Sequence, residues 1–194
     1  MPTTEITRKL GILIPIIQAP MAGSITTPEF VAAVSNAGGL GSFGAGYMNP
    51  HDLRRGITKI RSLTNKPFAV NLFIPEEHDA SPEEIQKTCM IIEQACHELQ
   101  INIPSASKPF SVSFAEQMNV IVEERVPVFS FTFGTLRSQW ITKLKRNKSI
   151  LIGTATNVAE AKCLQEAGVD MVVAQGCEAG GGIEVLLLER QVIR

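Results

Sequence analysis

Two carboxamide side chains stand at the ends of apolar runs, where they could bind the polar edge of a ligand. Asn71 ends the run 68–70, and Gln175 follows the four apolar residues 171–174. A carboxamide donates and accepts hydrogen bonds at once, as the edge of a pyrimidine-like ring requires. Gly180 and Gly181 follow shortly after Gln175, and glycine leaves backbone amides free to approach an anionic group. These residues indicate a site for a polar small molecule.

A proline turn provides a second element of such a site. Its residues are Ala19, Pro20, Met21 and Ala22. Proline fixes the chain, and small neighbours allow a flat ring to approach the backbone closely. Each feature also has a plainer interpretation: the turn could end a buried strand, the asparagine could cap a helix or turn, and the glycine pair could be a loop hinge. The residues alone leave both interpretations open.

Short apolar runs alternate along the chain with segments that begin like helices. We expect strands at residues 12–18, 39–43, 68–72, 126–131, 149–152 and 171–174. Helix starts are predicted at Thr27 and Asn49, which are each followed by proline, and at Ser81 and Ser113, which each have a glutamate three residues later. Gly38 and Gly168 stand where a left-handed residue would end a helix.

This alternation predicts an α/β fold with a parallel sheet. The strands are nearly continuous apolar runs, which a sheet buried on both faces requires. An open doubly wound sheet and a closed barrel give the same local pattern, so periodicity leaves that choice open. The stretch 72–126 is longer than the other crossovers, and we expect residues 101–109 to be an irregular insertion.

Five short motifs follow one another in order, each at the carboxyl end of a predicted strand. They lie at residues 15–23, 38–47, 67–73, 130–134 and 153–157, and V-A-Q-G-C-E-A-G-G at 173–181 follows them. The set resembles the nitronate monooxygenases, FMN-dependent enzymes also called 2-nitropropane dioxygenases, over residues 14–181. The resemblance implies a (β/α)8 TIM barrel, here incomplete with about six βα units. We expect residues 1–194 to form a single partial FMN-binding barrel domain.

The resemblance implies FMN as the cofactor and assigns residues to it. The cofactor-binding positions are Ala19, Pro20, Met21, Ala22, Asn71, Gln175, Gly180 and Gly181. In the family a histidine after the glycine pair is the catalytic base, and here that position holds Gly182, so no catalytic residue is assigned. A shifted reading of suitable codons restores His-Arg-Gly after the glycines. We therefore expect residues 182–194 to be an off-family tail from a frameshift in a longer gene, which the nucleotide sequence would decide.

We do not expect another side chain to replace the missing base. His51 lies in the first turn of a predicted helix, His78 in an acidic loop and His97 near a helix end. A solvated surface position is typical of such histidines. Glu178 is the carboxylate inside a motif, but it could act as a base only if burial raised its pKa, and we interpret it as structural.

Composition favours small-molecule chemistry. With 44% hydrophobic residues, a net charge of -1 and a pI of about 6.3, the chain has no electrostatic footprint for nucleic acid or an acidic membrane. The apolar run 10–19 is too short to span a bilayer and contains Pro15, so we expect a cytoplasmic location. The four cysteines lack metal-ligand spacing, which predicts reduced thiols and no metal site. The oligomeric state is left open.

The resemblance implies that an alkyl nitronate and O2 are converted to a carbonyl compound and nitrite, without a nicotinamide. A nitronate is already a carbanion, so its oxidation does not need the missing base, whereas a neutral nitroalkane must first lose a proton. Flavin-dependent enoyl-acyl-carrier-protein reductase, which shares the barrel and an E-A-G-G-H motif, is the alternative enzyme. The residues 130–134 and 153–156 fit the monooxygenase better. A third hypothesis is a non-catalytic truncated remnant that binds flavin weakly or not at all.

Overall fold

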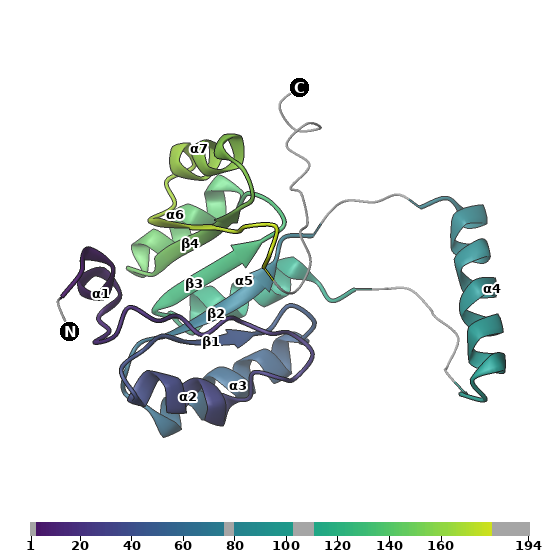
Figure 1. The fold of residues 1–194 in the computed structure, drawn as a ribbon, viewed down its shortest axis with the longest axis horizontal. Helices are drawn as coiled ribbons and strands as arrows, with labels where there is room; N and C mark the ends of the chain where they lie inside the picture. The colour runs from purple at the N-terminus through teal and green to yellow at the C-terminus, as the bar shows by residue number, and fades with distance from the viewer. Residues whose placement is uncertain (1–2, 76–79, 103–110, 180–194) are drawn as a thin grey trace. The chain divides into compact units, whose positions relative to one another are not determined.

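The computed structural model describes residues 3–75, 80–102 and 111–179 (Figure 1). Its contacts divide the chain into a sheet unit and a second unit at residues 76–112. The helices of the sheet unit are α1 (Glu5–Leu10), α2 (Pro28–Asn36), α3 (Pro50–Leu63), α5 (Phe114–Glu123), α6 (Ser138–Arg146) and α7 (Val158–Glu166). The second unit contains α4 (Pro82–Glu98), which has no buried residue.

Five parallel strands form one sheet in the order of the sequence. They are β1 (Gly41–Gly44), β2 (Phe68–Phe73), β3 (Val128–Thr132), β4 (Ile150–Ala155) and β5 (Met171–Ala174). Each strand pairs with the next, without the reversal of order that a doubly wound sheet has at its switch point. This consecutive order is the one that a (β/α)8 barrel requires, and the α/β barrel-type prediction is confirmed.

The predicted strand at residues 12–18 is wrong in extent. It contributes one parallel bridge, Ile17 with Leu40, beside β1. Pro15 explains the loss, because proline has no N–H for a ladder and fixes its own φ. On one side of it the amides of Leu13 and Ile14 both bond to the Gly38 carbonyl, at 2.8 and 2.9 Å, in place of a regular ladder. The chain still runs beside β1, in the first position of barrel order.

The helix boundaries follow the predicted caps. Thr27 and Asn49 each accept a bond from the amide three residues later, and proline occupies the first helical position of α2 and α3. Ser81 forms the complete capping box with Glu84, whereas at Ser113 only the cap bond, 3.4 Å from the Glu116 amide, is formed. Gly38 and Gly168 have φ of 97° and 88°, so the predicted left-handed stops after α2 and α7 are confirmed.

Side chains that alternate between the two faces of the sheet form two separate apolar cores. On the face that the helices cover, here called the outer face, Val70, Phe129 and Phe131 pack with residues of α2, α3, α5, α6 and α7. On the inner face Ala69, Val128 and Ile152 form a smaller cluster with Leu40 and with Leu10 and Ile12, which come from α1 and the residue after its cap. Figure 1 shows α1 at the end of the sheet where the strands begin. The inner core therefore fills the amino-terminal half of this face.

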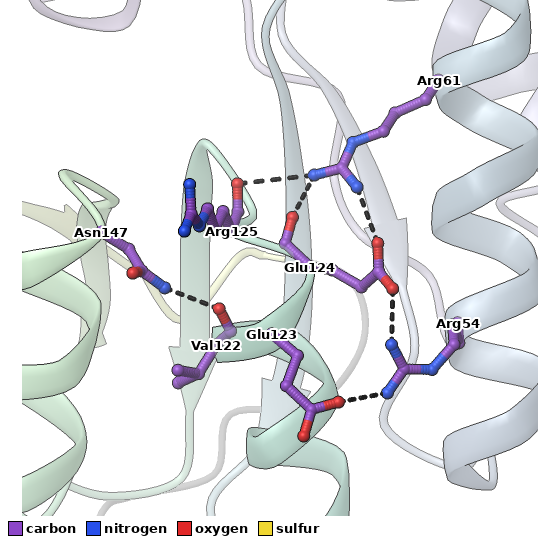
Figure 2. A network of polar contacts seen from close by, with 7 residues as sticks. All are labelled: Arg54, Arg61, Val122, Glu123, Glu124, Arg125 and Asn147. Atoms are coloured by element: carbon purple, nitrogen blue, oxygen red, sulfur yellow. Dashed lines mark hydrogen bonds and ion pairs between the residues drawn. The ribbon is translucent and has the colours of Figure 1, made fainter.

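An arginine and glutamate network joins α3 to the end of α5 (Figure 2). Glu124 accepts from Arg54 at 2.6 Å and from Arg61 at 2.7 Å, and Arg54 also pairs with Glu123. These hydrogen bonds to Glu123 and Glu124 raise the pKa of Arg54 above its ordinary value. The Arg61 guanidinium also donates to the backbone carbonyl of Glu124. Side chains from one helix thus satisfy carbonyl and carboxylate groups at the carboxyl end of the other.

A second ionic cluster joins the strands to α1 and α6. Asp170, just before β5, accepts from the Leu151 amide at 2.9 Å and pairs with Lys145 at 2.5 Å and Lys9 at 3.9 Å. Burial raises the pKa of the Asp170 carboxyl, but the hydrogen bonds from Lys145 and Leu151 and the charges of Lys145 and Lys9 outweigh burial. The pKa therefore lies below the usual aspartate value.

We expect Asp170→Asn to lower the free energy of unfolding at pH 7 by on the order of 1 kcal/mol, because a partly exposed ionic cluster loses its anion. A lowered folded-state pKa stabilises above about pH 4, and this stabilisation is lost as the pH falls through the folded-state pKa. The difference between the two proteins in thermal unfolding should therefore shrink on acidification. Glu29→Gln, which removes an exposed carboxylate 3.9 Å from Lys59, is the control with little expected effect. A difference that persists unchanged at pH 3 would contradict the assignment.

Candidate functional site

The loop after the first bridge crosses the carboxyl end of β1 at van der Waals distance. A Cβ atom on Gly44 would lie 2.5 Å from the Met21 carbonyl carbon and 2.8 Å from the Ala22 amide nitrogen. The Thr26 hydroxyl holds the two segments together: it accepts from the Gly44 amide at 2.8 Å and donates to the Met21 carbonyl at 2.9 Å. Thr26 is 1% exposed. The proline turn is therefore a fixed platform on the strand end.

Gln18 fastens the other end of this turn to β1. Its side-chain oxygen accepts from the Ser42 amide at 2.9 Å, and its side-chain nitrogen donates to the Ser42 carbonyl at 3.2 Å. The carboxamide thereby takes the place of a strand residue where the backbone bridge has ended. The same nitrogen donates to the carbonyl of Ala19, which sets the entry to the turn.

Small polar side chains occupy the inner face beyond the apolar cluster. Asn71 is 2% exposed, and its Nδ2 donates to Ser130 Oγ at 3.0 Å across paired strands. Thr132 lies two residues after Ser130 on the same face of β3, which it ends. Among the described residues, Thr132 Oγ1 is the buried side-chain oxygen or nitrogen without a hydrogen-bond partner. The inner face thus changes from hydrocarbon to hydrogen-bonding groups toward the carboxyl ends.

Three aromatic rings pack together at the carboxyl ends of β1, β2 and β3. The ring of Phe73 lies 5.4 Å from that of Tyr47 and 5.0 Å from that of Phe133, centroid to centroid. Tyr47 is 72% exposed, so the row reaches solvent. Phe133 has a φ of 68°, which is unfavourable for a residue with a side chain and is found most often near functional sites.

A buried carboxylate organises the loop after β4. Glu160, 1% exposed, accepts from the Thr156 amide at 2.6 Å, from the Thr156 hydroxyl at 2.9 Å and from Asn157 Nδ2 at 2.8 Å. Asn157 in turn caps α7 through the Glu160 amide. The motif at residues 153–157 is therefore a self-contained strand-to-helix turn. Beside it, the Gln175 amide donates to the Ala155 carbonyl at 2.9 Å, directly after β5.

The structure places most predicted cofactor residues at the carboxyl side of the sheet. Ala19, Pro20, Met21 and Ala22 form the platform over β1, Asn71 is two residues from the end of β2, and Gln175 follows β5. Gly180, Gly181 and the base position Gly182 lie outside the described residues. Contact of these residues with FMN stays a prediction.

The predicted surface positions of two histidines can be checked. The His51 side chain is 83% exposed in the first turn of α3, beside Asp52, and His97 is exposed on α4; His78 lies outside the described residues. Glu178 is exposed, and its carboxylate lies against Gly176. Among the described residues, no group of three His, Cys, Asp or Glu could hold a metal ion, and Cys89, Cys96, Cys163 and Cys177 are free thiols. Within these described residues, each helix is too short or too polar to serve as a membrane span.

Sequence reasoning missed the roles of Gln18, Thr26, Thr132 and Glu160. Gln18 bonds to Ser42 and Thr26 to Gly44, which lie 24 and 18 residues later in the chain. The residues around Gln18 and Thr26 give no indication of these distant partners. Thr132 carried a signal, since Ser130 and Thr132 alternate with phenylalanines in the run 129–133. Small polar residues at period two in an apolar strand indicate a polar inner face.

Comparison with known proteins gives a consistent family. A sequence profile described as nitronate monooxygenase matches residues 4–190. That range ends inside the segment 182–194, whose off-family origin stays a prediction. A probable nitronate monooxygenase of Staphylococcus saprophyticus is 45% identical over 179 residues, which are 92% of this chain and 50% of that protein. One from Staphylococcus haemolyticus is 44% identical over 177 residues, 91% of this chain and 49% of that protein.

Solved structures of two kinds resemble the fold. A nitroalkane oxidase from Streptomyces ansochromogenes superimposes with a TM-score of 0.79 at 33% identity, covering 90% of this chain and 50% of that one. FabK from Thermotoga maritima superimposes with a TM-score of 0.70 at 33% identity, covering 95% and 48%. The chain thus spans about half the length of the curated relatives and of these structures.

We expect Thr26→Val to destabilise the platform by about 1–3 kcal/mol, because the Gly44 amide and the Met21 carbonyl lose their partner in a buried place. The substitution keeps the shape of the side chain. Thr26→Ser keeps the hydroxyl and should lose less. Thermal unfolding, together with the rate of proteolytic cleavage within residues 19–25, measures the effect. Equal behaviour of the two variants would show that the hydroxyl does not hold the loop.

Proposed function

Because the chain belongs to the nitronate monooxygenase family, we propose that the protein binds FMN at the carboxyl ends of its strands and oxidises alkyl nitronates with O2, giving a carbonyl compound and nitrite. The observation that carries the proposal is the buried Asn71 carboxamide, set among polar groups on an otherwise apolar inner face. A buried carboxamide is unfavourable unless its groups are hydrogen-bonded, and Ser130 pairs with one N–H of Asn71, so the remaining donor and acceptor favour a further polar partner. The edge of a flavin is such a partner.

The platform fits one face of a flavin ring. A planar ring needs backbone without projecting side chains, and the turn at residues 19–22 offers proline and alanine with a fixed course over Gly44. Because Thr26 and Gln18 hold this backbone before any ligand binds, little conformational entropy is lost on binding. We propose that Ala19, Pro20, Met21 and Ala22 contact the ring in this way.

The polar groups fit the edge of the ring. Among the described residues, the Asn71 side chain donates one N–H to Ser130, and its oxygen and second hydrogen can serve a ligand. We propose that Gln175, directly after β5, serves another part of the same edge. Gly180 and Gly181, beyond the described residues, would present backbone amides to an anionic group of the cofactor.

The chemistry divides between cofactor and protein. When bound, FMN would supply the electron acceptor for the nitronate carbanion. The side chains of this chain would bind and orient the reactants and keep water away, since the inner core of Leu10, Ala69 and Val128 fills the other end of the same face. The base position of the family holds Gly182. We therefore propose preformed nitronates, rather than neutral nitroalkanes, as substrates of this chain, in a cytoplasmic setting.

The similarity to FabK keeps the enoyl-acyl-carrier-protein reductase as an alternative enzyme. The family match and the staphylococcal relatives favour the monooxygenase. The cofactor requirement separates them: the proposed reaction consumes O2 and no nicotinamide. Oxidation of NADH that depends on a crotonyl thioester would support the reductase, and absence of flavin binding would support the remnant hypothesis.

We expect Asn71→Ala to weaken FMN binding by about 1 kcal/mol, or about fivefold in Kd, because the ring edge loses a neutral hydrogen-bond partner. Quenching of flavin fluorescence on titration with protein measures Kd. Asn36→Ala removes a carboxamide that bonds the Leu63 carbonyl on the surface, and it should leave Kd unchanged. An unchanged Kd for Asn71→Ala would count against a direct contact.

The substrate proposal predicts a large preference for the deprotonated form. With FMN present, the protein should release nitrite from a preformed alkyl nitronate, and kcat/KM for the neutral nitroalkane should be lower by about 10²-fold or more, the usual contribution of a general base. Parallel assays at one pH, started with freshly neutralised nitronate or with equilibrated nitroalkane, make the comparison. Similar values for the two forms would mean that a base exists in the chain, with Glu178 and His78 the residues to substitute first.

A further inference from the structure

Among the residues that the structure describes, Thr132 has a buried hydroxyl without a hydrogen-bond partner. By contrast, the buried hydroxyls of Thr26 and Ser149 donate to backbone carbonyls at 2.9 and 2.7 Å. A buried polar atom without a partner destabilises the folded protein, and such atoms in native structures occur where a ligand or another function requires them.

The backbone on both sides of Thr132 is held in place. Its carbonyl accepts from the Ile74 amide at 3.0 Å, and it pairs in register with Phe73 of β2. Phe133 and Gly134 follow with φ of 68° and 151°, and a Cβ atom at Gly134 would lie 2.9 Å from the Ile74 side chain. The strand end therefore cannot shift to find the hydroxyl a protein partner, and unfavourable backbone angles set its position.

The side chain of Thr132 lies on the inner face. It alternates with Phe131, which packs in the outer core under the helices. It is two residues nearer the carboxyl end of β3 than Ser130, the partner of Asn71. The residue is half-buried although its oxygen is covered, and rotation about χ1 exchanges the positions of a threonine's hydroxyl and methyl groups. The hydroxyl can therefore reach a ligand without backbone movement.

We propose that the Thr132 hydroxyl is a ligand-binding group of this site, which donates a hydrogen bond to an oxygen that carries partial negative charge. The inference rests on the proposed function, under which such oxygens come from two sources, a carbonyl of the flavin edge or the nitro group of the nitronate. A hydroxyl donates and accepts, whereas the neighbouring Ser130 already accepts from Asn71. Thr132 thus adds a donor at the level of the aromatic row.

The test compares Thr132→Val, which keeps the shape and removes the hydroxyl, with Thr132→Ser, which keeps the hydroxyl. Three quantities are measured on each protein: the unfolding temperature without ligand, the Kd for FMN from fluorescence quenching, and KM for ethyl nitronate with saturating FMN. Thr142→Val is the matched control, since that hydroxyl bonds the Ser138 carbonyl on the exposed side of α6. It should behave as the wild type in both ligand measurements.

We expect Thr132→Val to unfold at the same or a higher temperature than the wild type without ligand, because no hydrogen bond is lost there. It should weaken one ligand by about threefold to tenfold, the range for one neutral hydrogen bond, while Thr132→Ser stays close to the wild type. A rise in the Kd for FMN identifies the flavin as the acceptor. A rise in KM with an unchanged Kd identifies the nitronate.

Two results would overturn the inference alone: a Thr132→Val protein with unchanged Kd and KM, or one that unfolds earlier without ligand, which would show that the hydroxyl has a structural partner. A wild-type protein that binds neither FMN nor nitronate would overturn the proposed function, and this inference with it. Ligand binding by the wild-type protein therefore distinguishes failure of the proposed function from failure of this inference.

Discussion

Every feature of the site depends on the alternation of side chains along parallel strands. In β2 and β3 this alternation directs Val70, Phe129 and Phe131 to the helices and Ala69, Asn71 and Ser130 to the other face. A shift of one residue in register would bury the carboxamide under helices and expose the phenylalanines on the inner face. Burial of the outer core thus fixes the strands, and the fixed strands set the positions of the polar groups.

Much of the fold was predictable because its signals are local. The five strands and the caps at Thr27, Asn49 and Ser81 are determined by residues close in sequence, and the structure confirms them. The prediction of a strand at residues 12–18 was wrong in extent, because one proline interrupts strand pairing even within an apolar run. Consecutive strand order cannot be derived from periodicity at all, and it was expected from resemblance alone.

The candidate site was predictable in its location and not in its construction. Strand-end motifs pointed to the proline turn and to Asn71. What fixes them comes from a distance in sequence: Thr26 and Gln18 hold β1, and Ser130 holds Asn71 from 59 residues away. Pairings of this kind follow from tertiary structure, so a single sequence indicates candidate binding residues but does not show which residues position them. The family match identifies the family of the chain, but it does not show which residues contact one another.

The packing of Leu10 and Ile12 against the amino-terminal half of the inner face limits how a ligand could enter and leave the site. Hydrocarbon covers that end of the face, so under the proposed function a bound molecule would exchange with solvent across the carboxyl ends of the strands. Substrate would then enter, and product would leave, by the same route. A product that leaves slowly would exclude the next reactant, and turnover would follow the rate of escape rather than the rate of electron transfer.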